Sequence, residues 1–161
     1  MIVDSDNSLF NQYSTQFLRG MSERMRDSCT SSQLNEFLKE RFTFFREAIR
    51  RSGMVRVRKH KISQFSLTEK NHNRCVIVEI VSPDAPFIVV TVEALMRQLD
   101  LLILCKLHPI IGVEMTEGKE VVKVFLPQQD LEKYDHLYLE VETEADNATL
   151  KHIETMIAGH M

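Results

Sequence analysis

Six histidines and three cysteines are the side chains of this 161-residue sequence best suited to binding a metal or attacking a substrate. No two histidines stand four residues apart and no H-E-x-x-H motif occurs, so no local zinc site is indicated. Cys29, Cys75 and Cys105 match neither a zinc pattern nor a C-x-x-C redox pair. Cys75 and Cys105 fall on segments expected to be neighbouring strands, where buried packing is favoured over the cationic setting of a catalytic thiolate. We predict no metal site and no catalytic residue in this chain.

His108, directly before Pro109, is the most notable of the histidines. Its position can serve a general base or a ligand of an effector. The alternative, a histidine at a strand end bonded to backbone, is favoured.

Phosphate-binding loops are missing from the sequence. The five glycines are scattered, and neither G-x-G-x-x-G nor G-K-[ST] occurs. A dinucleotide needs such a turn at a helix N-terminus, so we expect no NAD or other cofactor to bind this chain.

Composition indicates an ordinary globular protein, with 43% hydrophobic and 27% charged residues and a net charge of -3. This charge exerts no general attraction toward nucleic acid or acidic membranes. The longest apolar run, Leu101–Cys105, is too short to span a bilayer, and the polar first residues do not resemble a signal peptide. An odd number of cysteines with no recognisable spacing favours reduced thiols and a cytoplasmic location.

Two helices are expected first, over about Ser8–Asp27 and Gln33–Arg51, because apolar residues recur there at helical spacing. Ser32 is a candidate cap of the second helix and Gly53 ends it. The charged segment Val55–Ile62 reads as an edge strand or an extended linker, and Thr68–Arg74 as a polar loop.

The second half alternates strands and helices. Cys75–Val81 is almost fully apolar, as a buried strand requires, and Ser82, Asp84 and Pro86 are start signals for a following helix. In that helix, one face is expected to hold Ile88, Thr91, Val92, Leu95 and Leu99. A long strand is expected over Leu101–Met115, with a break at Pro109, followed by a hairpin at Glu117-Gly118 into Glu120–Leu126 and a loop over Pro127–Asp135.

The end of the chain is expected to hold one strand and one helix. The strand turns Leu137, Leu139, Val141 and Thr143 inward, and Tyr138, Glu140, Glu142 and Glu144 outward. The last helix is capped by Asp146 or Asn147 and carries one apolar stripe of Leu150, Ile153 and Ile157.

This order predicts an α+β fold: a mixed, ferredoxin-like sheet with helices on one face, preceded by two N-terminal helices. The step from Cys75 to Met115 should be right-handed, with its two strands parallel. The final strand of the motif comes either from Val55–Ile62 or from a longer polypeptide, and we favour the second alternative, in which the strand is missing here.

Two charged patterns allow other functions. Glu140, Glu142 and Glu144 alternate on one strand face and could act as paired acids, but a solvated face is favoured. The basic segment Arg46–Lys61 could contact RNA, yet ferredoxin-like RNA platforms stack bases on exposed aromatic residues, which Cys75–Val81 lacks. We expect a solvated or interdomain basic face, with no nucleic acid and no membrane as partner.

The segment Val78–Val89 reads VEIVSPDAPFIV, and about twenty residues later His108-Pro109-Ile110 ends a strand. This pair of motifs resembles the first ACT-like domain of the large NAD-dependent glutamate dehydrogenases, which show V-E-I-V-N-D-D-M-P-F-L-V-D-S-V and then H-P-V. The resemblance covers roughly Phe37–Ile157. It implies an N-terminal helical segment at residues 1–54, an edge strand or linker at 55–74, and an ACT-like domain, truncated before its last strand, at 75–161.

The chain departs from the family pattern at two places. Val90 and Thr91 replace an Asp and a Ser, and helical phase places Val90 away from the core, where it can touch another domain. General ACT modules have a glycine after the proline, where amino-acid effectors approach the backbone, whereas Phe87 stands here. The resemblance leaves candidate effector or interface residues at Asp84, Pro86, Phe87, Val90 and His108.

The resemblance implies a non-catalytic regulatory or assembly module of an oligomeric oxidoreductase that converts L-glutamate and NAD to 2-oxoglutarate, ammonia and NADH. Its partners would be other copies or other domains of the same enzyme, and an amino-acid effector. Two alternatives stay open: a free-standing ACT-like amino-acid sensor and a ferredoxin-like RNA-binding domain.

Overall fold

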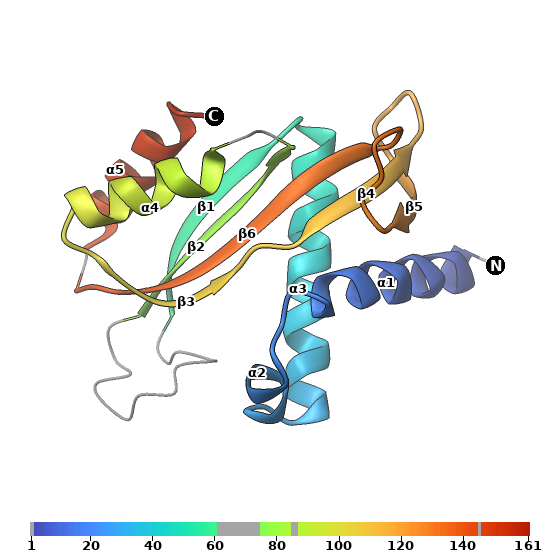
Figure 1. Cartoon of the computed structure of the whole chain (residues 1–161), viewed down its shortest axis with the longest axis horizontal. Coiled ribbons are helices and arrows are strands. Elements are labelled where there is room, and N and C mark those ends of the chain that lie inside the picture. Colours follow the sequence, from blue (N-terminus) through green and yellow to red (C-terminus); the bar gives the residue numbers. More distant parts are fainter. Residues whose placement is uncertain (1, 61–74, 85–86, 145) are drawn as a thin grey trace. The chain divides into compact units, whose positions relative to one another are not determined.

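The computed structural model describes residues 2–60, 75–84, 87–144 and 146–161 (Figure 1). The helices in this part of the chain are α1 (Ile2–Leu18), α2 (Glu23–Asp27), α3 (Ser31–Arg50), α4 (Ile88–Gln98) and α5 (Asn147–Ala158). The strands are β1 (Met54–His60), β2 (Cys75–Pro83), β3 (Leu102–Leu107), β4 (Ile110–Met115), β5 (Val121–Phe125) and β6 (Glu132–Glu142). The α+β fold expected from the sequence is confirmed.

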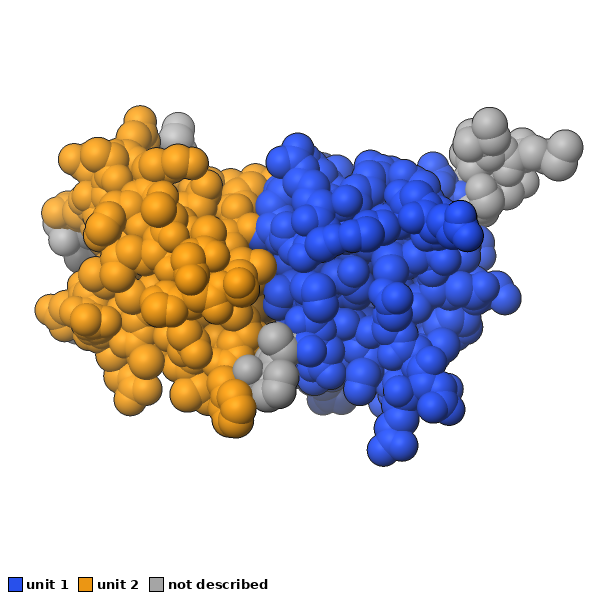
Figure 2. Space-filling view, turned by 90° about the horizontal axis from the view of Figure 1, so that it is seen from above, with its two compact units in different colours: residues 1–54, 81–84, 108–136 blue, residues 55–80, 85–107, 137–161 orange. Residues whose placement is uncertain are grey.

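The chain forms two compact units, coloured blue and orange in Figure 2. Unit 1 comprises Met1–Met54, Val81–Asp84 and His108–His136; unit 2 comprises Val55–Ile80, Ala85–Leu107 and Leu137–Met161. The long strands β2 and β6 contribute to both, so the units interleave along the sequence.

Unit 2 holds the strand order of a split βαβ motif. The hydrogen-bonded order runs β1-β2-β6, and β3 pairs with β6 in antiparallel register, with Cys105 opposite Glu140. Strand β1 therefore lies beside β2, in the place of the motif's last strand. The last strand of the motif therefore comes from the Val55–Ile62 segment, and our preference for a strand supplied by a longer polypeptide is wrong. The charged side chains of β1 are compatible with this place, because it is an edge of the sheet. The expected adjacency of β2 and β3 is wrong, since β6 pairs with both.

Helices α4 and α5 cover one face of the unit 2 sheet (Figure 1). Their apolar stripes meet Leu137, Leu139 and Val141, which face inward on β6 as predicted. The stripe of α5 also follows the prediction, with Leu150, Ile153 and Ile157 buried. Asp146 caps this helix by accepting a hydrogen bond from the Thr149 amide at 2.8 Å.

Unit 1 joins the N-terminal helices to the β4–β5 hairpin and the first part of β6. The hairpin pairs antiparallel, and β4 also pairs antiparallel with β6, with Ile110 opposite Asp135. Gly112 suits this position, because a Cβ here would lie 3.0 Å from the Leu126 carbonyl oxygen and would press against the backbone after β5. Strand β6 begins at Glu132, so the expectation of a loop up to Asp135 is wrong for its last residues.

The helix boundaries differ from the expected ones at three places. The first is the start of α1, which begins at Ile2 rather than near Ser8. The first predicted helix is two helices, because the chain turns at Gly20 and Ser22 caps α2 by accepting from the Met25 amide at 3.2 Å. Thr30 rather than Ser32 caps α3, in a capping box with Gln33. The break at Pro109 separates β3 from β4, as predicted. The predicted loop Thr68–Arg74 lies outside the described residues.

Candidate functional site

The N-terminal end of α4 exposes two large apolar side chains. Phe87, the N-cap residue, is 76% exposed, and Val90 is 60% exposed. Phe87 stands just before the helix and Val90 in its first turn, and we call this pair of exposed apolar side chains the α4 tip. The opposite side of α4 packs into the core of unit 2 through Ile88, Val92, Leu95 and Met96.

Phe87 has a backbone conformation that bulky side chains rarely adopt. Its φ of 75° and ψ of 1° lie in the left-handed region, which costs about 1–2 kcal/mol for a residue with a Cβ. Phe87 makes no side-chain cap, and its carbonyl accepts from the Thr91 amide at 2.9 Å. Of the expected start signals, Ser82 lies within β2 and Asp84 contacts Lys133, whereas Pro86 is outside the described residues. An exposed ring on a strained backbone contributes little to the stability of the fold. A phenylalanine at this position therefore indicates a role in function rather than in folding.

Asp84 and His108 lie in unit 1 and both contact β6. The Asp84 amide donates a hydrogen bond to the Lys133 carbonyl at 2.8 Å, and the Asp84 carboxylate lies 3.5 Å from the Lys133 ammonium. His108 Nε2 lies 2.8 Å from Oδ1 of the buried Asp135. We expected the His108 side chain to bond to backbone. Its partner is instead the Asp135 carboxylate, which orients the imidazole.

The structure thus sorts the candidate residues into two groups. Asp84 and His108 reach residues two apart on β6, within unit 1. Phe87 and Val90 share the end of α4, within unit 2. Pro86 falls outside the described residues.

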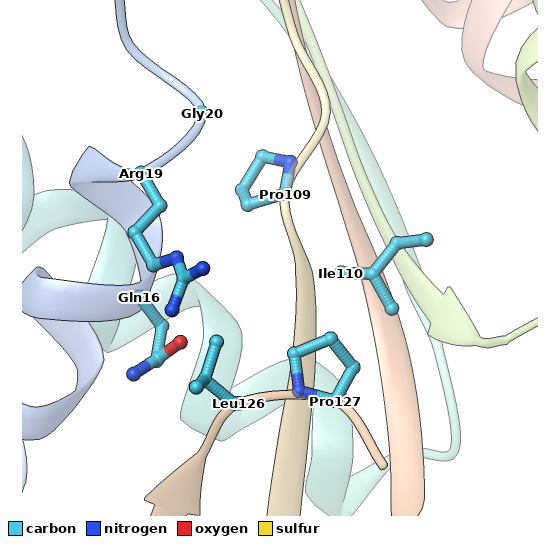
Figure 3. Close-up of a pocket in the computed structure, with 7 residues that line it drawn as sticks. All are labelled: Gln16, Arg19, Gly20, Pro109, Ile110, Leu126 and Pro127. Carbon is cyan, nitrogen blue, oxygen red and sulfur yellow. The ribbon is translucent and has the colours of Figure 1, made fainter. Parts of the chain in front are cut away.

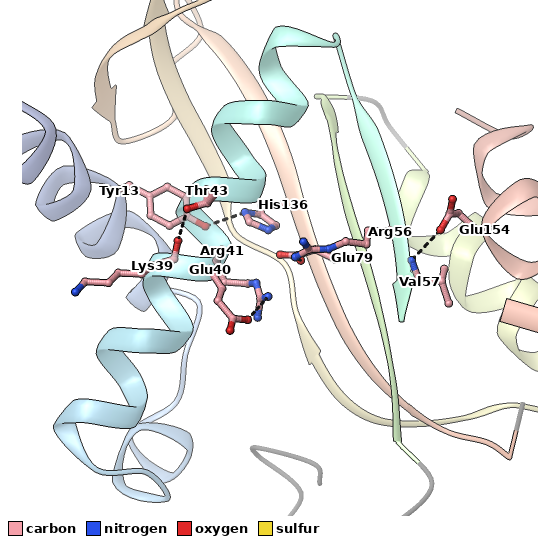
Figure 4. Close-up of polar contacts among 10 residues, drawn as sticks. All are labelled: Tyr13, Lys39, Glu40, Arg41, Thr43, Arg56, Val57, Glu79, His136 and Glu154. Carbon is pink, nitrogen blue, oxygen red and sulfur yellow. Dashed lines mark hydrogen bonds and ion pairs between the residues drawn. The ribbon is translucent and has the colours of Figure 1, made fainter. Parts of the chain in front are cut away.

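A buried histidine, which the sequence analysis did not single out, lies in the aromatic core of unit 1 (Figure 4). His136 Nδ1 and the Tyr13 hydroxyl are hydrogen-bonded at 2.9 Å. The Phe45 ring stacks on the imidazole with 5.7 Å between centroids, and Phe17 meets it edge-on at 5.3 Å. The available signal was the spacing of Tyr134 and His136, two residues apart, which is typical of one strand face.

Polar side chains are buried on the second face of the unit 2 sheet. The Arg56 guanidinium donates to the fully buried Glu79 carboxylate at 2.8 Å (Figure 4), and the Tyr138 hydroxyl donates to Glu140 at 2.8 Å. The prediction that Tyr138 and Glu140 face solvent is wrong, because both are buried. A signal was present in the fully apolar Cys75–Val78 run, which predicts a strand covered on both faces.

The two buried cysteines are poor nucleophiles. Burial raises the pKa of Cys75 from 9.0 to about 12, with a further contribution from the Glu140 carboxylate. Burial, then Glu140, raises the pKa of Cys105 as well. Because the thiolate is the reactive form, these positions are suited to packing.

The basic segment is engaged in ion pairs. Each pair joins an arginine to a carboxylate: Arg46 to Asp6 at 3.5 Å, Arg50 to Glu120 at 2.7 Å, Arg51 to Glu47 at 3.1 Å and Arg56 to Glu79 at 2.8 Å. Pairing with Glu120 also raises the pKa of Arg50 and lowers that of Glu120. These arginines therefore already have anionic partners within the chain; Lys61 lies outside the described residues.

The described part of the chain shows neither a cluster of metal ligands nor a long apolar helix. Its histidines, cysteines and carboxylates form no cluster of three or more that could hold a metal ion. Within the same residues, no helix combines the length and apolar character needed to cross a bilayer.

The split βαβ strand order of unit 2, with two helices on one face, defines an ACT-like α+β domain. The family model of the ACT1 domain of glutamate dehydrogenase matches residues 13–157, and the chain belongs to this family. The match confirms the resemblance seen in the sequence and extends it into α1, which supplies Tyr13 and Phe17 to the core of unit 1. No curated protein and no solved structure matches the chain.

Proposed function

We propose that the chain is a non-catalytic regulatory and assembly module of an NAD-dependent glutamate dehydrogenase. The parent enzyme would convert L-glutamate and NAD to 2-oxoglutarate, ammonia and NADH in the cytoplasm, with NAD and substrate bound by another domain. This module would hold domains of the oligomer together through the α4 tip. Membership in the ACT1 family of glutamate dehydrogenase supports this role.

The observation that carries the proposal is the exposed, left-handed Phe87. A glycine would adopt this backbone conformation without strain, and a polar side chain would meet water at lower cost. An apolar ring at this position is explained if a partner buries it. Val90, where the family pattern has an Asp, extends the same surface by one apolar side chain.

The partner that fits best is another domain of the same enzyme. Two apolar side chains at one helix end are a small anchor, which suits contacts between domains that are already held on one assembly. Phe87 also stands where general ACT modules have a glycine for amino-acid effectors, which favours a contact role over amino-acid sensing. The ion pairs of the basic segment likewise favour a protein partner over nucleic acid.

A Phe87→Gly variant separates the two effects of this residue. We expect it to raise the free energy of unfolding by up to about 1 kcal/mol, since relief of strain exceeds the entropy cost of glycine. We expect the same variant to weaken binding to the remaining domains of the enzyme at least about tenfold, because an aromatic anchor is lost. Denaturant unfolding and sedimentation of mixed domains measure the two quantities.

Leu102→Ser is the matched control, because Leu102 on β3 is 60% exposed, as Val90 is. It should leave the binding of the remaining domains unchanged. Equal binding by wild-type chain and Phe87→Gly would refute the proposed role of the α4 tip.

A further inference from the structure

Unit 1 contains a pocket of about 240 Å³ that is distinct from the α4 tip (Figure 3). One wall is the C-terminal end of α1 and the residues after it, and the other is formed by the start of β4 and the chain after β5. The lining residues are Gln16, Arg19, Gly20, Pro109, Ile110, Leu126 and Pro127. This volume is below that of pockets for drug-sized ligands, so it suits a small metabolite.

The polar groups of the pocket are gathered on the α1 side. Figure 3 shows the Arg19 guanidinium and the Gln16 amide pointing into the space between the two walls. Arg19 has no acidic partner among the described residues, unlike the paired arginines of the basic segment. A guanidinium presents a planar fork of donors that matches the two oxygens of a carboxylate.

The other wall is apolar. Pro109 is buried, whereas Ile110 and Leu126 are 37% and 43% exposed. Together with Pro127 they offer aliphatic surface that a ligand could cover. A ligand that matches both walls has a carboxylate at one end, which faces Arg19, and an aliphatic body at the other, which faces the apolar wall.

The charges of the lining residues limit which ligands the pocket can bind. None of the lining residues is acidic, so the ammonium of an amino acid would find no anionic partner there. Arg19 is the single cation of the lining, so a dianion such as glutarate would keep one charge without a partner in the pocket. We infer that this pocket binds small aliphatic monocarboxylates, such as branched-chain acids without an amino group.

Titration of the full chain with 4-methylpentanoate tests this inference, followed by calorimetry and by methyl NMR. We expect saturable binding, with shifts at Ile110 and Leu126 and none at Leu102, which lies in the other unit. Leucine, glutarate and inorganic phosphate should bind at least about tenfold more weakly, for the reasons of charge given above.

Arg19→Met should weaken 4-methylpentanoate at least about tenfold, and Arg19→Lys should restore part of the affinity, since lysine keeps the charge without the fork. Arg24→Met, which removes an exposed arginine on α2 outside the pocket, is the matched control and should bind as wild type does. Absence of saturable binding, or unchanged binding by Arg19→Met, would overturn the inference. Neither result bears on the α4 tip, whose test measures the binding of other domains.

Discussion

Replacing Phe45 with alanine is expected to lower the free energy of unfolding by about 3–5 kcal/mol. Phe45 is fully buried on α3, and its ring centroid lies 5.1 Å from that of Tyr13 and 6.4 Å from that of Tyr134. Its ring also stacks on the imidazole of His136. Truncation removes these contacts and leaves a cavity beside a buried polar pair, which the helix and the strand can fill only in part. Denaturant unfolding, followed by circular dichroism, measures the loss.

Phe10→Ala is the matched control for this prediction. Phe10 lies on α1, is only partly buried, and contacts Phe42 with 5.7 Å between ring centroids. Its truncation should cost about 1 kcal/mol, since part of its surface already meets water. Equal losses for the two variants would show that the cluster around His136 is not the core of unit 1.

A steep loss of stability above pH 9 is the second large effect expected. Burial raises the pKa of both Cys75 and Cys105, the first to about 12. Below pH 9 the thiols hold their protons in the folded and the unfolded state alike. Above it the unfolded thiols ionise while the folded ones stay neutral, so unfolding releases protons and becomes more favourable as the pH rises. At a pH about 1.5 units above 9 each thiol costs about 2 kcal/mol of stability.

The variant Cys75→Ala/Cys105→Ala should show a much shallower decline between pH 8 and pH 10.5, whatever its stability at neutral pH. Tyr134, whose pKa burial also raises, contributes equally to both proteins. Cys29→Ala keeps both buried thiols and should follow the wild-type curve closely. Parallel curves for wild type and the double variant would contradict the assignment of buried, neutral thiols.

The α4 tip and the Arg19 pocket give this domain two separate surfaces. The first consists of apolar side chains held on a helix end at the cost of backbone strain. The second combines one cation with aliphatic walls inside unit 1. A module that contacts other domains at one place and binds a small acid at another has the parts that regulation requires, two sites and a partner to be influenced.

Much of the fold could be read from local patterns. Periodicity predicted α3, α4 and α5 with their buried faces, because a helix repeats its apolar stripe within a few residues. Alternation predicted the inward positions Leu137, Leu139 and Val141 of β6. The spacing of Pro86-Phe87 and His108-Pro109 indicated the family, which the ACT1 match confirms.

Burial of polar side chains could not be read in the same way. The alternation of side chains along a strand places Tyr138 and Glu140 on one face of β6. The same alternation occurs whether that face contacts water or protein, so it does not predict burial. In the structure Glu140 accepts a hydrogen bond from Tyr138, and Glu79 pairs with Arg56, a residue 23 positions away in the sequence. The partner of Glu79 comes from a distant segment, and the burial of Tyr138 and Glu140 depends on what packs against their face, so only the tertiary structure decides both.

By itself, the sequence determined the α+β class, the apolar faces of the helices and the family of the domain, because each depends on spacing within a short segment. Only the tertiary structure decided that β1 takes the edge beside β2, that His136 is buried against Tyr13, and that Arg19 faces an apolar wall. The physical reason is that strand pairing and cavity formation join residues far apart in the chain, and no local periodicity records which of them meet.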